Sequence, residues 1–247
     1  MEVVDAPEWL VPSFARSVAA AGGTATTDEV CAAARRLLAR WSGRRRFHRV
    51  RHLADVLARV DELGPEVHEP ALVRLAVWYH GALLDAQLLT GSHGAGPDGD
   101  GEDETASADA AVAGLSALGV PAPRAHRVGA LVMVLAGHDP DPADTDAAVL
   151  CDADLGVLAV EPQKYRTYVR TVREEHADVP DADFLTARRT IVTDLLARRA
   201  IYRSPGAGPW EEAARGNLQA ELHRLDRELA TLPEPATVPS QAAPPVP

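Results

Sequence analysis

The spacing of apolar residues along the chain predicts a succession of helices. Val30, Ala34, Leu37, Leu38 and Trp41 recur at the three- and four-residue intervals that place side chains on one face of a helix. The same spacing, bounded by Gly and Pro, predicts helices over 9–20, 45–63, 70–79, 104–118, 125–136, 145–158, 162–176, 183–202 and 210–232. Few runs favour strands, so we expect an all-α protein, with these helices forming a single bundle.

Polar segments between and beyond these runs predict the domain organisation. Residues 91–103 are rich in Gly and Asp and lack apolar anchors, so we expect a mobile loop there. Residues 233–247 are rich in Pro without periodicity, which is typical of a disordered tail. Residues 1–24 form an N-terminal extension or a first helix, and residues 25–232 form one helical domain.

Four polar residues are candidates for helix caps. Thr26 and Thr27 precede one apolar run, and Thr145 or Asp146 precedes another. Hydroxyl and carboxylate side chains at these places accept hydrogen bonds from the free N–H groups of a first turn.

Composition restricts the classes of function. The chain has 247 residues, 46% of them hydrophobic, and a net charge of -11, which argues against an extended nucleic-acid-binding surface. Cys31 and Cys151 are far apart in apolar helical segments, so we expect two reduced thiols. No apolar run reaches the roughly 18 residues of a membrane span, and no secretory signal opens the chain, so we expect a cytoplasmic protein.

Two groups of histidines could carry chemistry. His48 and His52 lie four residues apart, which puts both imidazoles on one helix face; the alternative is a solvated basic face. Arg45 and Arg49 flank them, and guanidinium groups match phosphate oxygens, so both are candidate phosphate-binding residues. His80 ends the apolar run AVWYH, where it is either a packed core residue or a metal ligand on a rigid helix.

Two carboxylates inside an apolar segment are a further indication of a functional site. Asp152 and Asp154 lie in VLCDADLGVL, where burial is costly unless the groups are paired or bind metal. Two residues apart, they point in different directions, so only one faces a site; the alternative places both on a solvent side. His138 and Asp139 follow a buried helix, either facing a cavity or forming an ordinary turn.

Taken in order, these segments resemble the HD superfamily of metal-dependent phosphohydrolases, and most closely a bacterial group of predicted HD phosphohydrolases. The resemblance covers roughly residues 30–230. The segments that carry it are RRFHRVRH, AVWYHGALLD, DETASA, LAGHDP, DADLGVL and REEH. It implies an all-α HD-domain fold and hydrolysis of a phosphoester, such as a nucleotide or another small phosphorylated molecule, by metal-activated water.

Carried over residue by residue, the resemblance implies that His52, His80 and Asp154 bind a divalent ion, which would be Mn, Fe, Zn or Mg. These three side chains should therefore converge in space. Further candidates are His48, Asp85 and Glu104 as catalytic residues, and Ser107, His138 and Asp152 as supporting or second-metal residues.

Gly81 departs from the family pattern, which places the aspartate of the His-Asp pair there. Three hypotheses follow. The chain is a phosphohydrolase with one ion or a repaired site; or an inactive relative that binds a phosphorylated ligand; or a helical scaffold for a protein partner. Asp85 or Asp139 could replace the missing carboxylate. The sequence leaves the oligomeric state open.

Overall fold

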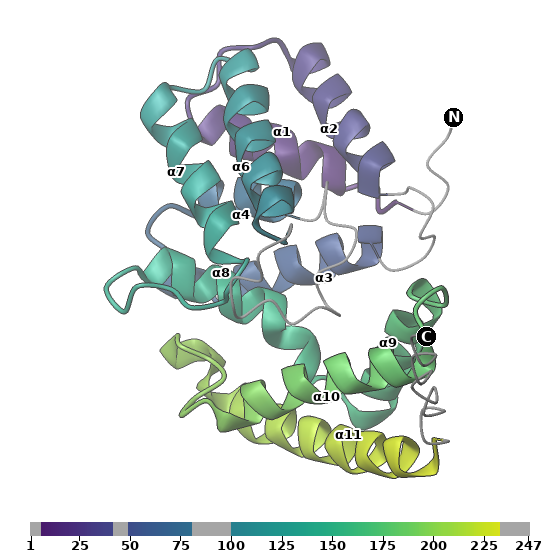
Figure 1. Ribbon diagram of the computed structural model, residues 1–247. Helices are drawn as coiled ribbons and strands as arrows, with labels where there is room; N and C mark the ends of the chain where they lie inside the picture. The colour runs from purple at the N-terminus through teal and green to yellow at the C-terminus, as the bar shows by residue number, and fades with distance from the viewer. Residues whose placement is uncertain (1–5, 42–48, 81–99, 233–247) are drawn as a thin grey trace, which may run out of the picture.

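The computed structural model describes residues 6–41, 49–80 and 100–232, and within these ranges every regular element is a helix (Figure 1). The predicted all-α class is therefore confirmed. The α-helices are α1 (Leu10–Ala20), α2 (Thr27–Trp41), α3 (Arg49–Glu62), α4 (Pro70–His80), α6 (Asp100–Ala117), α7 (Ala122–Val134), α8 (Thr145–Leu155), α9 (Pro162–Glu175), α10 (Asp181–Ala197) and α11 (Glu211–Thr231). Short 3-10 helices cover Gly64–Glu66, Gly156–Ala159 and Pro205–Trp210.

Figure 1 shows two groups of helices, with α3 and α8 between them. The first group contains α1, α2, α4, α6 and α7, and α4 lies at its centre in contact with α1, α6 and α7. Eight residues of α4 are buried, including its last residue, His80. A helix that is apolar on nearly every side is stable only when surrounded. The second group contains α9, α10 and α11.

Helix α8 contributes to both hydrophobic cores. Leu150 and Cys151 pack in the core of the first group, whereas Val149 and Leu155 pack in the core of the second. Asp154 is thus carried by a helix that lies where the two cores meet. Both cysteines are unpaired, and burial raises the pKa of the Cys151 thiol well above its ordinary value, so it stays protonated.

Local signals set the starts of two helices as predicted. Thr26 and Glu29 form a capping box at the start of α2, in which the Glu29 carboxylate accepts from the Thr26 N–H at 2.8 Å and from its hydroxyl at 2.7 Å. Helix α4 begins at Pro70, whose missing N–H costs nothing in a first turn.

Several predicted boundaries are wrong. Helix α6 begins at Asp100, so residues 100–103 belong to a helix and not to the predicted loop, whose residues 91–99 lie outside the described ranges. Acidic residues suit a helix N-terminus, and the glycines of this segment hid that signal. Helix α7 begins at Ala122, because Pro123 is tolerated in a first turn.

The bounds of α8 and α10 also differ from the prediction. The cap of α8 is Asp144, whose side chain accepts from the Ala147 N–H at 3.0 Å, and not Thr145 or Asp146. Helix α10 ends at Ala197, because Arg198 adopts an extended backbone that starts a connecting segment.

The described part of the predicted N-terminal extension includes α1, which packs against α2 and α4. The predicted tail, 233–247, lies outside the described residues. None of the helices in the described ranges has the length and apolarity that a membrane crossing requires.

Candidate metal centre

Three helices bring together the side chains predicted to bind metal. His52 lies in the first half of α3, His80 is the last residue of α4, and Asp154 lies near the end of α8. The Asp154 Oδ1 atom is 2.9 Å from His52 Nε2 and 3.3 Å from His80 Nε2, and the two Nε2 atoms are 3.4 Å apart. The predicted convergence of these residues is therefore observed, and all three atoms could hold one ion.

The proton position on His80 follows from its surroundings. Its Nδ1 atom is 2.8 Å from the carbonyl oxygen of Val77. A carbonyl oxygen only accepts, so Nδ1 carries a proton, and this hydrogen bond directs Nε2 toward His52 and Asp154. This arrangement is typical of a metal-binding histidine, in which the second nitrogen donates to the backbone and fixes the ring.

The spacing of the three atoms fits a metal ion. Ligand atoms about 2.0–2.1 Å from zinc are about 3.3–3.4 Å apart in a tetrahedron and about 2.9 Å apart at a right angle. The observed separations of 2.9, 3.3 and 3.4 Å cover this range. The donor set of two imidazoles and one carboxylate suits zinc, iron and manganese.

A third histidine contacts the other oxygen of the same carboxylate. His138 Nε2 is 2.8 Å from Asp154 Oδ2, so Asp154 is bonded on both oxygens. Burial alone would raise the pKa of Asp154, but hydrogen bonds from His138, His52 and His80 outweigh it and hold the pKa well below its usual range. Asp154 is therefore a carboxylate, the form that binds a cation.

The centre is enclosed on one side and partly open on another. The Trp41 ring lies 5.4 Å from the His80 ring and 6.3 Å from the His52 ring, measured between centroids, and its Nε1–H donates to the Trp78 carbonyl at 3.0 Å. The side chain of His80 is 6% exposed, whereas that of His52 is 28% exposed. Among the described residues of the centre, the side of His52 is therefore more accessible than the side of His80.

Asp152 supports the fold behind the centre. Its buried carboxylate accepts from the backbone N–H of Arg203 at 2.9 Å and of Ser204 at 2.6 Å. Burial raises its pKa, against these hydrogen bonds. As the spacing of two predicts, Asp152 and Asp154 face different partners, and Asp152 acts on the segment after α10.

The other candidates fall into two sets. Ser107 is fully buried on α6, and its hydroxyl has no hydrogen-bond partner among the described residues. The remaining positions lack a described backbone or a described side chain. Arg45, His48, Gly81 and Asp85 lie outside the described residues, and the side chains of Arg49 and Glu104 are not described.

Sequence reasoning missed Trp41 and Arg59 as neighbours of the centre. Arg59 lies two turns after His52 on α3, and its guanidinium donates to the Ala153 carbonyl at 3.4 Å, beside Asp154. A seven-residue interval, which returns to the same helix face, was the available signal for Arg59. Asp139 is exposed and pairs with Arg203 at 3.0 Å, so it does not replace the carboxylate missing at Gly81.

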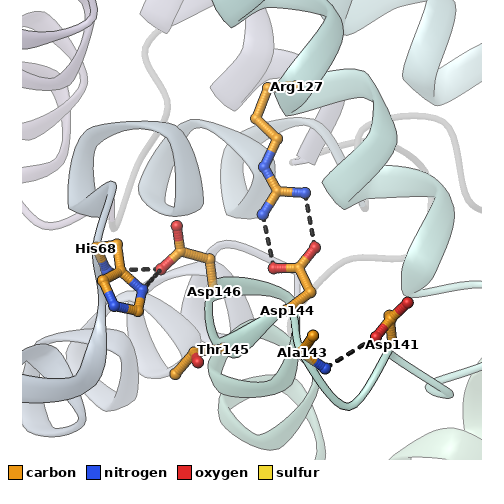
Figure 2. Close-up of a pocket in the computed structure, with 7 residues that line it drawn as sticks. All are labelled: His68, Arg127, Asp141, Ala143, Asp144, Thr145 and Asp146. Carbon is orange, nitrogen blue, oxygen red and sulfur yellow. Dashed lines mark hydrogen bonds and ion pairs between the residues drawn. The ribbon is translucent and has the colours of Figure 1, made fainter.

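A second polar hollow lies at the opposite ends of α4 and α8 (Figure 2). Asp146 accepts from the backbone N–H groups of His68 at 2.7 Å and Glu69 at 3.1 Å, immediately before α4. Arg127 on α7 makes two hydrogen bonds of 2.7 Å to Asp144, the cap of α8. These carboxylates have their partners, and their contacts join the starts of α4 and α8 to the middle of α7.

From this junction, α4 and α8 each extend about 15 Å to the metal centre. Because both helices begin at this junction, it fixes where His80 and Asp154 lie along the two helix axes. Replacing Asp146 by alanine should lower the free energy of unfolding by about 2 kcal/mol, because the N–H groups of His68 and Glu69 lose the buried carboxylate that accepts from both. Urea denaturation of the metal-free protein measures this change.

Asp141 is the matched control for this substitution. It is exposed and accepts only from the N–H of Ala143, at 2.8 Å. Asp141→Ala should cost less than about 1 kcal/mol, and an equal loss in both variants would contradict the role given to Asp146.

Comparison with known proteins identifies no relative. No protein-family model matches the chain, and neither a curated protein nor a solved structure matches it.

Proposed function

We propose that this chain is a metal-dependent phosphohydrolase of the HD type that acts on a small phosphorylated molecule, such as a nucleotide. The observation that carries the proposal is the convergence of His52 Nε2, His80 Nε2 and Asp154 Oδ1 within 3.4 Å of one another. Two imidazoles that both face one carboxylate oxygen need a shared cation or proton, since lone pairs repel one another.

Zinc, iron or manganese fits these residues better than magnesium does. Magnesium prefers oxygen ligands and water, whereas imidazole nitrogen suits the transition metals. When bound, such an ion activates water for attack on a phosphate ester and offsets the charge that develops on the phosphate oxygens. The residues of the chain provide the rest of the site.

His80 and Asp154 are the rigid part of this site. His80 is fixed by its hydrogen bond to Val77, and Asp154 is fixed on its other oxygen by His138. Trp41 excludes water from one side of both imidazoles. His52, the most exposed of the three, faces the side from which substrate enters.

Arg59 supports an anionic substrate. Burial lowers its pKa, although the nearby Asp55 and Asp154 act to raise it, and no ion pair within the described part of the chain includes Arg59. A guanidinium has five N–H donors, and one of them contacts the Ala153 carbonyl, so the others can bind phosphate oxygens.

Metal analysis of the purified protein, paired with phosphatase assays, tests the proposal. We expect about one ion per chain and hydrolysis of p-nitrophenyl phosphate or nucleoside monophosphates that stops with a chelator and returns with metal. Protein that binds no zinc, iron or manganese after reconstitution, and hydrolyses none of these esters, would contradict it.

Gly81 favours a second candidate function, a protein that binds a phosphorylated ligand without turnover. The family pattern places a carboxylate at this position, and one carboxylate fewer weakens both metal binding and charge stabilisation. Metal and phosphate binding without hydrolysis would support this function, and a gain of hydrolysis in Gly81→Asp would identify a site that has lost its activity. Absence of both metal and phosphate binding would leave the helical scaffold.

A further inference from the structure

His138 reaches the centre from an unusual backbone conformation. It follows α7 in a turn, and its φ angle is 46°, in the left-handed region that side chains other than glycine rarely adopt. Its N–H donates to the Val134 carbonyl at 3.0 Å, so the turn is tight. In this conformation the ring contacts Asp154 at 2.8 Å. A conformation that is unfavourable by itself persists because other contacts hold it.

Those contacts come from Arg198, sixty residues further along the chain. One guanidinium nitrogen donates to the His138 carbonyl at 3.2 Å, and another donates to the Gly137 carbonyl at 3.3 Å. A planar guanidinium can hold two adjacent carbonyl groups at once, which a single ammonium cannot do with the same geometry. Arg198 therefore binds the backbone carbonyl groups of the turn and leaves the His138 ring available for its contact with Asp154.

Arg198 is itself held in place by the second group of helices. Its carbonyl oxygen accepts from Arg215 on α11 at 2.7 Å, and Glu211 on α11 accepts from the N–H of Ile201 at 3.0 Å. Asp152 fixes the same segment from α8 through the N–H of Arg203. The segment after α10 is thus anchored at several points, and Arg198 extends from it to the turn.

We propose that Arg198 is a positioning residue of the metal centre, which holds the turn at His138 so that His138 Nε2–H donates to Asp154 and orients this carboxylate toward the ion. This proposal rests on the proposed function, since it assigns Asp154 to a metal. Partners that orient a ligand in this way change metal affinity by about 10- to 100-fold. Arg198 acts through His138 and does not touch the ion.

A double-mutant cycle with Zn²⁺ as the probe tests this role. The dissociation constant is measured by calorimetry for the unaltered chain, Arg198→Ala, His138→Ala and the double variant. We expect each single substitution to weaken binding by about 10-fold, and the double variant to bind as His138→Ala does, because Arg198 then has no histidine to position. The absorption spectrum of bound Co²⁺ should change in each single variant, and the spectrum of the double variant should match that of His138→Ala.

Two further variants complete the experiment. Arg198→Lys keeps one donor and should bind Zn²⁺ with an affinity between those of the unaltered chain and Arg198→Ala; it also serves if Arg198→Ala does not fold. The neighbouring Arg199 is exposed, so Arg199→Ala is the matched control and should leave binding unchanged.

The outcomes separate this inference from the proposed function. If the unaltered chain binds no Zn²⁺ or Co²⁺, the proposed function fails and the inference fails with it. If the unaltered chain binds Zn²⁺ and Arg198→Ala binds it equally well, only the inference is overturned. Losses that simply add in the double variant would also overturn it, because they would show that Arg198 does not act through His138.

Discussion

Replacing Asp154 by alanine should abolish the metal binding proposed for this chain. Asp154 Oδ1 lies within 3.3 Å of both imidazoles, and Asp154 is the carboxylate of the cluster formed by the described residues. Its removal leaves two neutral nitrogens and no negative charge. We expect the affinity for Zn²⁺ to fall by more than about 100-fold, since partners outside the coordination sphere alone account for about 10- to 100-fold.

The same variant should lose the proposed phosphatase activity in parallel with the proposed metal binding. Asp154→Asn keeps the shape of the side chain and removes its charge, so it should behave like Asp154→Ala if charge is what matters. Asp194→Asn on α10, where the side chain is exposed, changes the net charge equally and serves as the control. Zinc content and affinity that remain unchanged in Asp154→Ala would refute the assignment of this centre.

The sequence predicts the helices best where local chemistry decides their ends. The capping box of Thr26 and Glu29 and the proline at position 70 are signals within a few residues, and both helices begin where they indicate. The end of α10 was predicted too late, because contacts of Glu211 with the N–H groups of Ile201 and Tyr202 stabilise an extended segment. No local pattern contains that information.

The same distinction applies to the candidate site. Helical geometry alone predicts that Asp152 and Asp154 face different ways, and the structure shows one facing histidines and the other facing backbone N–H groups. The meeting of His52, His80 and Asp154 was predicted from the order of motifs. The contacts of Arg198 with the His138 turn and of Trp41 with the imidazoles depend on packing between distant segments, which periodicity does not reveal.

Breaking the buried ion pair between α10 and α11 should destabilise the fold more than most other single changes in the described residues. Arg188 and Glu221 are 2% and 1% exposed, and Arg188 Nε donates to Glu221 Oε1 at 2.8 Å. Burial would lower the pKa of Arg188, but Glu221 together with Tyr168 and Tyr165 outweighs burial and raises the pKa above its ordinary value. The Tyr165 hydroxyl also donates to Glu221, so this carboxylate joins three helices.

Glu221→Ala leaves the guanidinium of Arg188 buried without a counter-charge. We therefore expect the free energy of unfolding to fall by about 3–5 kcal/mol in guanidinium denaturation. Replacing both partners by apolar residues of similar volume, as in Arg188→Met with Glu221→Leu, should recover most of this loss, because no unpaired charge then remains in the core.

The same two helices provide a matched control. Arg189 and Asp226 form an ion pair at 2.6 Å, but their side chains are 50% and 47% exposed. Water already solvates both groups, so Asp226→Ala should cost less than about 1 kcal/mol. Equal losses of stability in Glu221→Ala and Asp226→Ala would contradict this prediction. They would show that burial does not determine how much an ion pair contributes to the free energy of unfolding, and that water reaches Arg188 more easily than its exposed fraction indicates.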